Sequence, residues 1–255
     1  MFVQERLDKI IKLINENNKV KVNELSDYFK VSKDLIRKDL SKLEEAGYLK
    51  RTYGGAIKIR HSAETLTISS RISKNVENKQ KIALKALEEI KEGDLIFLDI
   101  SSINYLLAQE IIKNNMNVTI ITNMIDIMHL FSTNIDTKAK LIGIGGNCNK
   151  IIGGFVGLSS VEQIKKYNIT KSFIGTIGIN IDTGIVSTYE EDDGLTKKCI
   201  INSSKHRYLI TEKSKIEQDG KYIFSSLTDF NCIIIDSDIE NITRNKIKQF
   251  HINVK

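Results

Sequence analysis

Basic and polar side chains gather on one face of a short segment in the first quarter of the chain. Over residues 33–46 the apolar residues recur at the spacing of an amphipathic helix. The positions between them carry the following side chains: Lys33, Asp34, Arg37, Lys38 and Ser41. An arginine can pair bidentately with guanine, and a lysine can reach a phosphate or a base edge. Ser32 can cap the helix, whose N-terminus itself favours phosphate. This pattern is typical of a helix that enters the major groove of DNA.

Polar residues also follow several short apolar runs later in the chain. Ser101 and Ser102 come after the run 94–99, Asn123 follows 118–122, and Gly145-Gly146 follow 140–144. If these runs are parallel strands, the polar residues lie at their carboxyl ends, where α/β proteins bind ligands. Hydroxyls and backbone N–H groups at a helix start suit a phosphate, although each serine or asparagine alone also fits an ordinary helix cap.

The acidic cluster 190–193 and two lysines add charge to the same predicted edge. Glu190 and Glu191 precede Lys197, and Lys215 follows a further apolar run. Acids at a helix start are stabilised by the helix dipole, so a solvated helix terminus explains them equally well. Taken together, the loops predict a polar, partly cationic cleft.

Residues suited to catalysis or metal binding are scattered. The histidines stand at 61, 129, 206 and 251, and the cysteines at 148, 199 and 232, without a C-x-x-C pair. The H-E-x-x-H, G-x-S-x-G and P-loop spacings are missing. We therefore expect histidines in surface or packing roles, buried free thiols, no catalytic residue, no metal and no cofactor.

The positive charge of the chain is concentrated near its start. The net charge is +6; residues 1–60 hold 14 Lys and Arg against 9 Asp and Glu, which gives +5, and the remainder holds 24 against 23. This asymmetry indicates a polyanion as the partner of the first quarter. Hydrophobic content of 41% and charged content of 27% are ordinary for a soluble globular protein. Without an apolar run of ~18 residues or an apolar leader, we expect a cytoplasmic protein and no membrane partner.

The basic residues of the first quarter lie within a predicted series of three helices followed by a hairpin. Helices are predicted over 5–15, 23–29 and 33–46, with a short strand at 19–22, and Gly47 as the helix C-cap. Strands at 48–50 and 56–58 flank a turn and predict a hairpin. This is a winged helix-turn-helix, in which Lys50, Arg51 and Tyr53 of the wing can touch the DNA backbone or minor groove.

The rest of the chain alternates helix and strand after a polar linker over 58–75. Strands are predicted at 94–99, 118–121, 140–144, 171–177, 207–211 and 232–235. Helices are predicted at 81–90, 102–113, 124–131, 158–167, 192–203 and 238–250. This order predicts an α/β domain with a mainly parallel sheet covered on both faces.

The first quarter resembles the winged helix of the DeoR-type (deoxyribose-operon repressor) regulators. Their signature reads V-S-x-x-T-I-R-R-D-L-x-x-L-E-x-x-G-x-L-x-R-x-H-G-G-A. The matching residues here are Val31-Ser32, Ile36-Arg37, Asp39-Leu40, Leu43-Glu44, Gly47, Leu49, Arg51 and Gly54-Gly55-Ala56. Leu35, Lys38 and Tyr53 replace a threonine, an arginine and a histidine, which bears on base preference rather than on the fold.

Residues 75–236 resemble the sensor domain of the same regulators, which is similar to ribose-phosphate isomerase and glucosamine-phosphate deaminase. The resemblance implies a sugar-phosphate site formed by Asp99, Ser101, Ser102, Asn123, Gly145, Gly146, Glu190, Glu191, Lys197 and Lys215. Ser101-Ser102-Ile103 stand where the family has Gly-Thr-Thr, which crowds the phosphate loop and removes one hydroxyl. Glu212 replaces an aspartate.

The sequence thus predicts a DNA-binding domain over 1–57, the linker over 58–75, and a sensing and oligomerisation domain over 76–255. The expected function is a repressor of a carbohydrate operon, with a double-stranded operator and a sugar phosphate as partners, acting as a homo-oligomer (dimer or tetramer). One alternative is an isomerase-like or deaminase-like enzyme, with Glu190, Glu191 or Asp192 as its base. Another is an architectural DNA-binding protein without a ligand, which a closed sensor cleft would favour.

Overall fold

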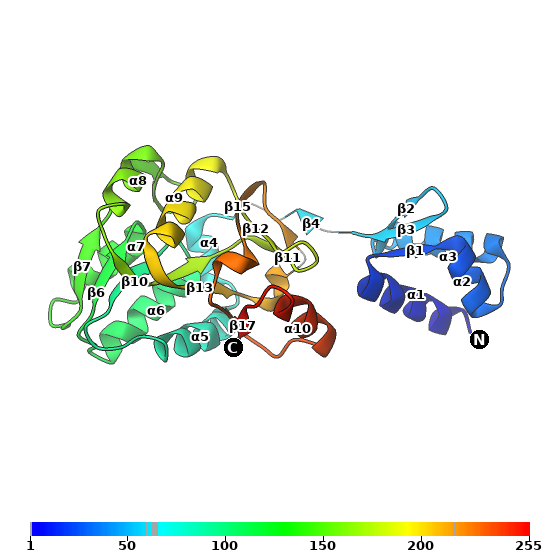
Figure 1. Cartoon of the computed structure of the whole chain (residues 1–255), viewed down its shortest axis with the longest axis horizontal. Coiled ribbons are helices and arrows are strands. Elements are labelled where there is room, and N and C mark those ends of the chain that lie inside the picture. Colours follow the sequence, from blue (N-terminus) through cyan, green and yellow to red (C-terminus); the bar gives the residue numbers. More distant parts are fainter. Residues whose placement is uncertain (1, 60, 63–65, 217) are drawn as a thin grey trace. The chain divides into compact units, whose positions relative to one another are not determined.

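The computed structural model describes residues 2–59, 61–62, 66–216 and 218–255. The chain forms two compact units, Met1–His61 and Ser62–Lys255 (Figure 1). A short strand, β4 (His61–Ser62), lies at the boundary between them.

The first unit is a winged helix-turn-helix, as predicted. Its elements in chain order are α1 (Val3–Asn17), β1 (Lys19–Lys21), α2 (Val22–Phe29), α3 (Lys33–Glu45), β2 (Leu49–Thr52) and β3 (Gly55–Lys58). The three strands form an antiparallel sheet in the order β1-β3-β2. Apolar side chains from each helix, including Ile10, Leu25 and Ile36, are buried in one core. The hydrophobic pattern therefore determines which face of α3 remains open.

Both ends of α3 are fixed by local chemistry. Ser32 caps the N-terminus, where its side chain accepts a hydrogen bond from the Leu35 amide (3.3 Å). At the other end the Tyr48 amide donates to the Leu43 carbonyl (2.9 Å). This bond, with Gly47 at φ 77°, closes the helix in a Schellman motif. The predicted glycine stop is confirmed.

The second unit is built on a seven-stranded sheet with the order β17-β16-β13-β10-β5-β6-β7. Its strands are β5 (Leu95–Leu98), β6 (Thr119–Thr122), β7 (Lys140–Gly143), β10 (Ile169–Gly175), β13 (Ser204–Thr211), β16 (Cys232–Ile235) and β17 (Asn253–Val254). Each neighbouring pair runs parallel. The predicted parallel α/β architecture is confirmed, with β17 as an edge strand that sequence patterning does not reveal.

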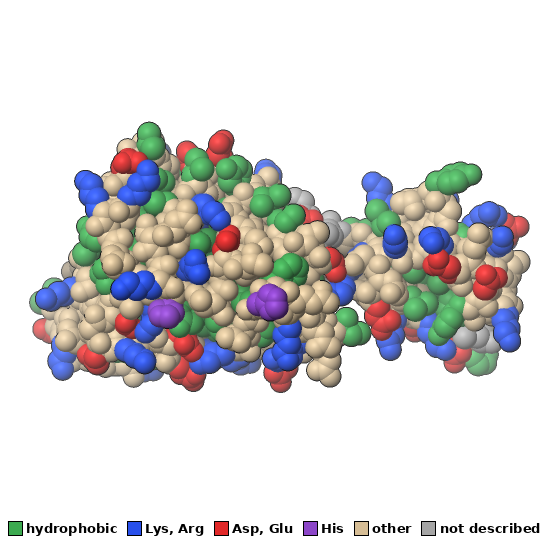
Figure 2. All heavy atoms as spheres, viewed as in Figure 1, with side chains coloured by type: hydrophobic (Ala, Val, Ile, Leu, Met, Phe, Trp, Pro, Cys, Tyr) green, Lys and Arg blue, Asp and Glu red, His purple; other side chains and the backbone are tan. Residues whose placement is uncertain are grey.

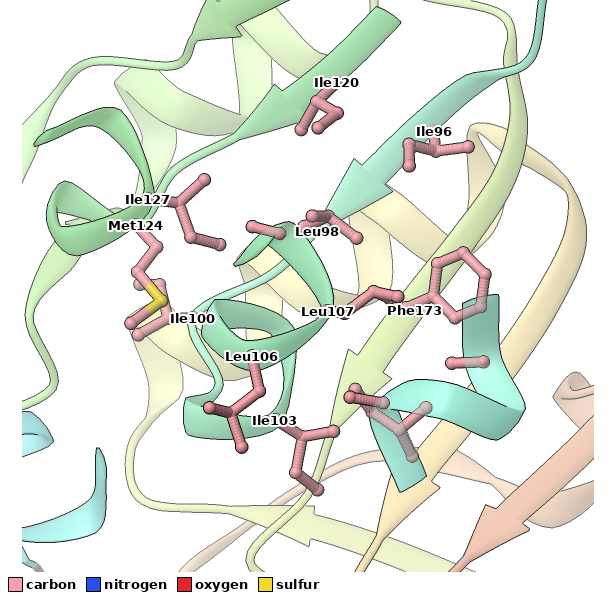
Figure 3. Packing of buried hydrophobic residues seen from close by; sticks show 14 of the residues in the cluster. Ile96, Leu98, Ile100, Ile103, Leu106, Leu107, Ile120, Met124, Ile127 and Phe173 are labelled. Carbon is pink, nitrogen blue, oxygen red and sulfur yellow. The ribbon is translucent and has the colours of Figure 1, made fainter. Parts of the chain in front are cut away.

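Helices cover both faces of this sheet. They are α4 (Ile68–Ser73), α5 (Val76–Leu87), α6 (Ser102–Lys113), α7 (Ile125–Thr133), α8 (Leu158–Ile164), α9 (Glu191–Asn202) and α10 (Asn241–Lys248). Figure 1 shows α5 and α6 on one side of the strands, with α8 and α9 on the other. Along β5 the buried residues alternate between two cores, because Ile96 and Leu98 join one cluster and Phe97 the other. The first cluster also contains residues of α6 such as Leu106 and Leu107, and Leu107 lies next to Leu98 of β5 (Figure 3).

Shorter strands and turns lie in the loops that follow the carboxyl ends of the sheet strands. They are the hairpin β8 (Asn147–Asn149) and β9 (Gly154–Val156), the antiparallel strands β11 (Gly178–Asn180), β12 (Ile185–Thr188) and β15 (Tyr222–Ser226), the strand β14 (Gln218–Asp219), and the 3-10 turns η1 (Lys213–Lys215) and η2 (Leu227–Asp229). None of these strands is predicted from the sequence. These strands are only two to five residues long, so their sequences are too short to show a detectable hydrophobic period.

The segment expected to be a linker contains a packed helix. Residues 68–73 form α4, capped by Thr67, whose side chain accepts a hydrogen bond from the Ser70 amide (3.4 Å). Ile68 is buried in the first cluster, and its amide donates to the Ile151 carbonyl (3.0 Å). A Cβ on Gly153 would lie 2.4 Å from Ile68 Cγ2, so that glycine makes room for the helix. The described part of 58–75 from residue 66 onward therefore packs with the second unit, and α5 begins at Val76 rather than Lys81.

Candidate nucleic-acid interface and ligand cavity

The open face of α3 carries the side chains predicted to read DNA. Lys33, Asp34, Arg37 and Lys38 are exposed, whereas Ile36, Leu40 and Leu43 on the other side are buried. The Arg37 guanidinium donates to the Asp34 carboxylate (2.6 Å), and both side chains face solvent. Asp34 thus holds the arginine beside the N-terminal turn of the helix. A base or phosphate that binds the Arg37 guanidinium must therefore compete with the Asp34 carboxylate.

The wing is joined to α3 by its arginine. The Arg51 side chain donates to Ser41 Oγ (3.0 Å), and the Arg51 amide donates to the Glu44 carboxylate (2.7 Å). Lys50 and Tyr53 are exposed on the wing. A Cβ on Gly55 would lie 2.0 Å from the Val20 carbonyl oxygen, which explains a glycine at the wing turn. Ser41 and Arg51 therefore set the angle between helix and wing.

A buried ion pair that the sequence analysis does not predict anchors the opposite face of α3. Arg6 Nε of α1 lies 2.6 Å from Asp39 Oδ2, and Arg6 Nη2 lies 3.2 Å from Asp39 Oδ1. The two residues are 4% and 1% exposed. The hydrogen bond to Asp39 raises the pKa of Arg6. The aspartate of the sequence signature therefore ties α3 to α1 and is buried away from the exposed face of α3.

On the face seen in Figure 2, Lys and Arg side chains (blue) are interspersed with acidic side chains (red) over both units, so this face carries no continuous basic surface. The DNA-binding interpretation therefore rests on the exposed side chains of α3.

The second unit contains a cavity of about 250 Å³ next to the carboxyl ends of β5, β10 and β13. Its lining includes three of the residues predicted for the effector, Ser101, Ser102 and Lys215. Burial lowers the pKa of Lys215, because a charge is unfavourable in this partly enclosed place. Its lining also includes residues that the sequence analysis places in a linker or does not single out: Leu66, Arg71, Lys74, Asn75 and Lys79.

Two serines form the start of α6 at the floor of the cavity. Both are buried, and Ser101 Oγ accepts a hydrogen bond from the Ile103 amide (3.2 Å). The crowding expected from a serine in the family's glycine position is relieved on β10. A Cβ on Gly175 would lie 2.8 Å from Ser101 Cβ, so the glycine leaves the space that the serine occupies.

Lys197 lines a second, smaller hollow of about 30 Å³ and is buried beside two acids. Its Nζ contacts the Asp99 carboxylate and lies 3.8 Å from Asp193 Oδ1. Asp99 also accepts hydrogen bonds from the Asn104 side chain (2.7 Å) and the Gly175 amide (3.0 Å). Burial lowers the pKa of Lys197, but the carboxylates of Asp193 and Asp99 outweigh it and raise the pKa. Lys197 is therefore charged and already neutralised.

The remaining predicted effector residues lie outside the lining of these two cavities. The Asn123 side chain is buried and donates to the Phe155 carbonyl (2.8 Å). The Gly145 carbonyl accepts from Ser160 Oγ (2.9 Å), and Gly146 lies against the same serine. Glu190 is exposed and accepts a hydrogen bond from Asn149, and Glu191 is exposed.

The described residues contain no group of three His, Cys, Asp or Glu side chains suited to a metal ion. Cys199 and Cys232 are buried as predicted, and burial raises the pKa of Cys232 to about 11, whereas Cys148 is exposed, contrary to prediction. Within the same residues, no helix has the length and apolar character to cross a membrane.

Comparisons with known proteins match both units. A family model described as the DeoR C terminal sensor domain matches residues 74–237, and a DeoR-like helix-turn-helix domain matches residues 6–62. The "Uncharacterized HTH-type transcriptional regulator FruR" of Bacillus subtilis is 32% identical, covering 95% of this chain and 94% of its own. The lactose phosphotransferase system repressor of Staphylococcus epidermidis is 29% identical, covering 96% of both chains. A solved ribose 5-phosphate isomerase from Methanocaldococcus jannaschii has a TM-score of 0.41 at 16% identity, covering 56% of this chain and 55% of its own.

Proposed function

The chain belongs to the DeoR family of helix-turn-helix regulators, and from this premise we propose that it represses a carbohydrate-metabolism operon under the control of a phosphorylated sugar. A relative of similar length is named a repressor of a sugar phosphotransferase system, which supports this assignment. A regulator must meet DNA, so the cytoplasmic location expected from the sequence belongs to the same proposal.

The observation that carries the sugar-phosphate part is the charge of the larger cavity. Four of its lining residues are basic, namely Arg71, Lys74, Lys79 and Lys215, against one carboxylate, Glu212. The start of α6 adds two serine hydroxyls. An excess of positive charge beside a helix N-terminus suits a phosphate, and the volume suits a small ligand.

The proposed DNA contacts are those of the open α3 face and the wing. Arg37 and Lys38 would meet base edges or phosphates, while Lys50 and Tyr53 would meet the backbone or minor groove. Homo-oligomers formed through the second unit would present two or more α3 helices to repeated half-sites. A sugar phosphate then releases DNA only if it binds one arrangement of the oligomer more tightly than the other.

The two alternatives have less support. The relatives named above are called transcriptional regulators and repressors, which disfavours an isomerase or deaminase. A ligand-free architectural protein was expected to have a closed sensor cleft, whereas a cavity is present in the second unit.

The proposal is tested by binding of the full chain to its own promoter region in gel shifts at two salt concentrations. Each shift is repeated with a panel of pentose and hexose phosphates and with the matching free sugars as controls. Sequence-selective binding released by one phosphate, and not by its free sugar, is the expected result. If no selective binding is found under any condition, the regulatory proposal fails, and the same compounds are assayed for turnover.

A further inference from the structure

One wall of the larger cavity comes from the junction between α4 and α5. Arg71 lies on α4, and Lys74 and Asn75 form the two-residue connection to α5. All three line the cavity together with Ser102 of α6 and Lys215 of η1. The first helix of the second unit therefore contributes directly to the cavity that the strand ends were expected to form alone.

A buried lysine and a buried glutamate hold this junction in place. Lys79 Nζ donates to the carbonyl oxygens of Arg71 and Lys74, the latter at 2.5 Å, and lies 3.9 Å from Glu212 Oε1. Glu212 Oε2 accepts a hydrogen bond from the Asn75 side chain (2.8 Å). Lys79 and Glu212 are thus engaged with each other and with the backbone. The cations that remain for a ligand are Arg71, Lys74 and Lys215.

Arg71 is positioned to accept a further partner. Its Nη2 donates to the Ile152 carbonyl (3.1 Å), and its guanidinium carbon lies 5.6 Å from the centre of the Tyr189 ring. Its Nε is buried and has no hydrogen-bond partner. A buried N–H group without an acceptor is unfavourable, and a guanidinium matches the geometry of a phosphate.

We propose that Arg71 and Lys74 bind the phosphate group of the effector, together with Lys215 and the start of α6. The inference rests on the proposed function and places the phosphate monoester of the effector beside the three cations that line this part of the cavity. Burial lowers the pKa of Lys215 and of Lys79; Glu212 opposes this shift, and the neighbouring cations add to it, so a bound anion would offset the repulsion among the cations.

This placement gives the ligand a direct effect on the segment that leads to the DNA-binding unit. Residues 62–67 alone separate α4 from the first unit in the chain. A phosphate that neutralises Arg71 and Lys74 holds α4 more firmly against the sheet. Occupancy of the cavity therefore stabilises the point from which the connection to the DNA-binding unit departs.

The test measures phosphate binding by the full chain and its variants in isothermal titrations. The probes are inorganic phosphate and the sugar phosphates of the gel-shift panel. Because a hydrogen bond to a charged group contributes more than a neutral one, Arg71→Gln and Lys74→Gln should each weaken binding by roughly tenfold or more. Lys81→Gln, which removes an exposed charge from α5 outside the cavity lining, is the matched control and should bind like the native chain. All three variants should retain their affinity for the operator in the absence of ligand.

Hydrogen exchange of the native chain provides a readout that needs no variant. Saturating phosphate should slow exchange of the amides in 68–79 if α4 becomes more firmly held. Native phosphate affinity in both Arg71→Gln and Lys74→Gln, with binding lost in Lys215→Gln, would overturn this inference and leave the proposed function standing. If no phosphate compound binds the native chain, the inference and the proposed sugar-phosphate control fail together.

Discussion

Replacing Asp39 by asparagine should destabilise the DNA-binding unit without touching its reading face. The substitution keeps the side-chain volume but leaves the Arg6 guanidinium buried opposite a neutral amide. Breaking a fully buried ion pair costs ~3–5 kcal/mol, and exposed pairs contribute far less. Because a small unit can relax around the unpaired charge, we expect a loss of about 2–3 kcal/mol. For a domain of this size that lowers Tm by roughly 10–20 °C.

Calorimetry of the full chain measures this loss, with hydrogen exchange in α1 and α3 identifying which transition belongs to the first unit. The double variant Arg6→Met with Asp39→Leu is the control, because it replaces both charges by apolar groups of similar size. Such replacements of a whole buried pair are often neutral, so the double variant should recover most of the lost stability. Native stability in Asp39→Asn would show that the pair does not anchor α3 and would refute the reasoning.

Arg37→Ala should weaken operator binding by ~1–3 kcal/mol and relax specificity at the base pair that Arg37 contacts. Binding assays with operator variants measure both effects, and unchanged operator affinity would contradict the role assigned to Arg37. Lys215→Ala should leave DNA binding intact and abolish the release of DNA by the sugar phosphate. A normal response to the effector would show that Lys215 is not part of the effector site. Burial raises the pKa of Asp229, but hydrogen bonds from Lys198 and Ser225 outweigh this effect and lower that pKa to about 2, from an ordinary value of 3.8. The ionised carboxylate therefore contributes stability that is complete above the unfolded pKa and is lost as pH falls through about 2. Because the Asp229 side chain is one-third exposed, Asp229→Asn should lower the free energy of unfolding by only about 1 kcal/mol at pH 6. Equal denaturation midpoints of the native chain and the variant at pH 6 would contradict this expectation.

The elements that the sequence predicts well are those with a long amphipathic period or a clear stop. The helix predicted at 33–46 is α3 (Lys33–Glu45), and the helix predicted at 102–113 is α6 (Ser102–Lys113). Gly47 ends the first of these as expected, because its φ of 77° suits glycine. Strands such as β5 and β16 were recognisable because both of their faces are covered, which makes each a short continuous apolar run.

Residues whose roles depend on distant partners were not predictable. Asp39 meets Arg6 across 33 positions of sequence, and nothing local distinguishes it from a solvated acid on α3. Lys197 was expected at the ligand because of its place in a motif, yet its ammonium group is enclosed by Asp99 and Asp193. The helix α4 has a single fully packed residue, Ile68, so its sequence has no period to detect.

The arrangement of carboxylates in the second unit favours binding over turnover. A general base must reach the substrate with a lone pair that is not already occupied. Of the residues that line the larger cavity, Glu212 is the one carboxylate, and it already accepts a hydrogen bond from Asn75 and lies beside Lys79. At the smaller hollow Asp193 accepts a hydrogen bond from Thr188 and lies beside the charged Lys197. Each acid therefore stabilises a loop or neutralises a lysine, while Arg71, Lys74 and Lys215 remain for an anion. The larger cavity thus has more cationic than acidic side chains in its lining, which suits the binding of a phosphate better than the abstraction of a proton.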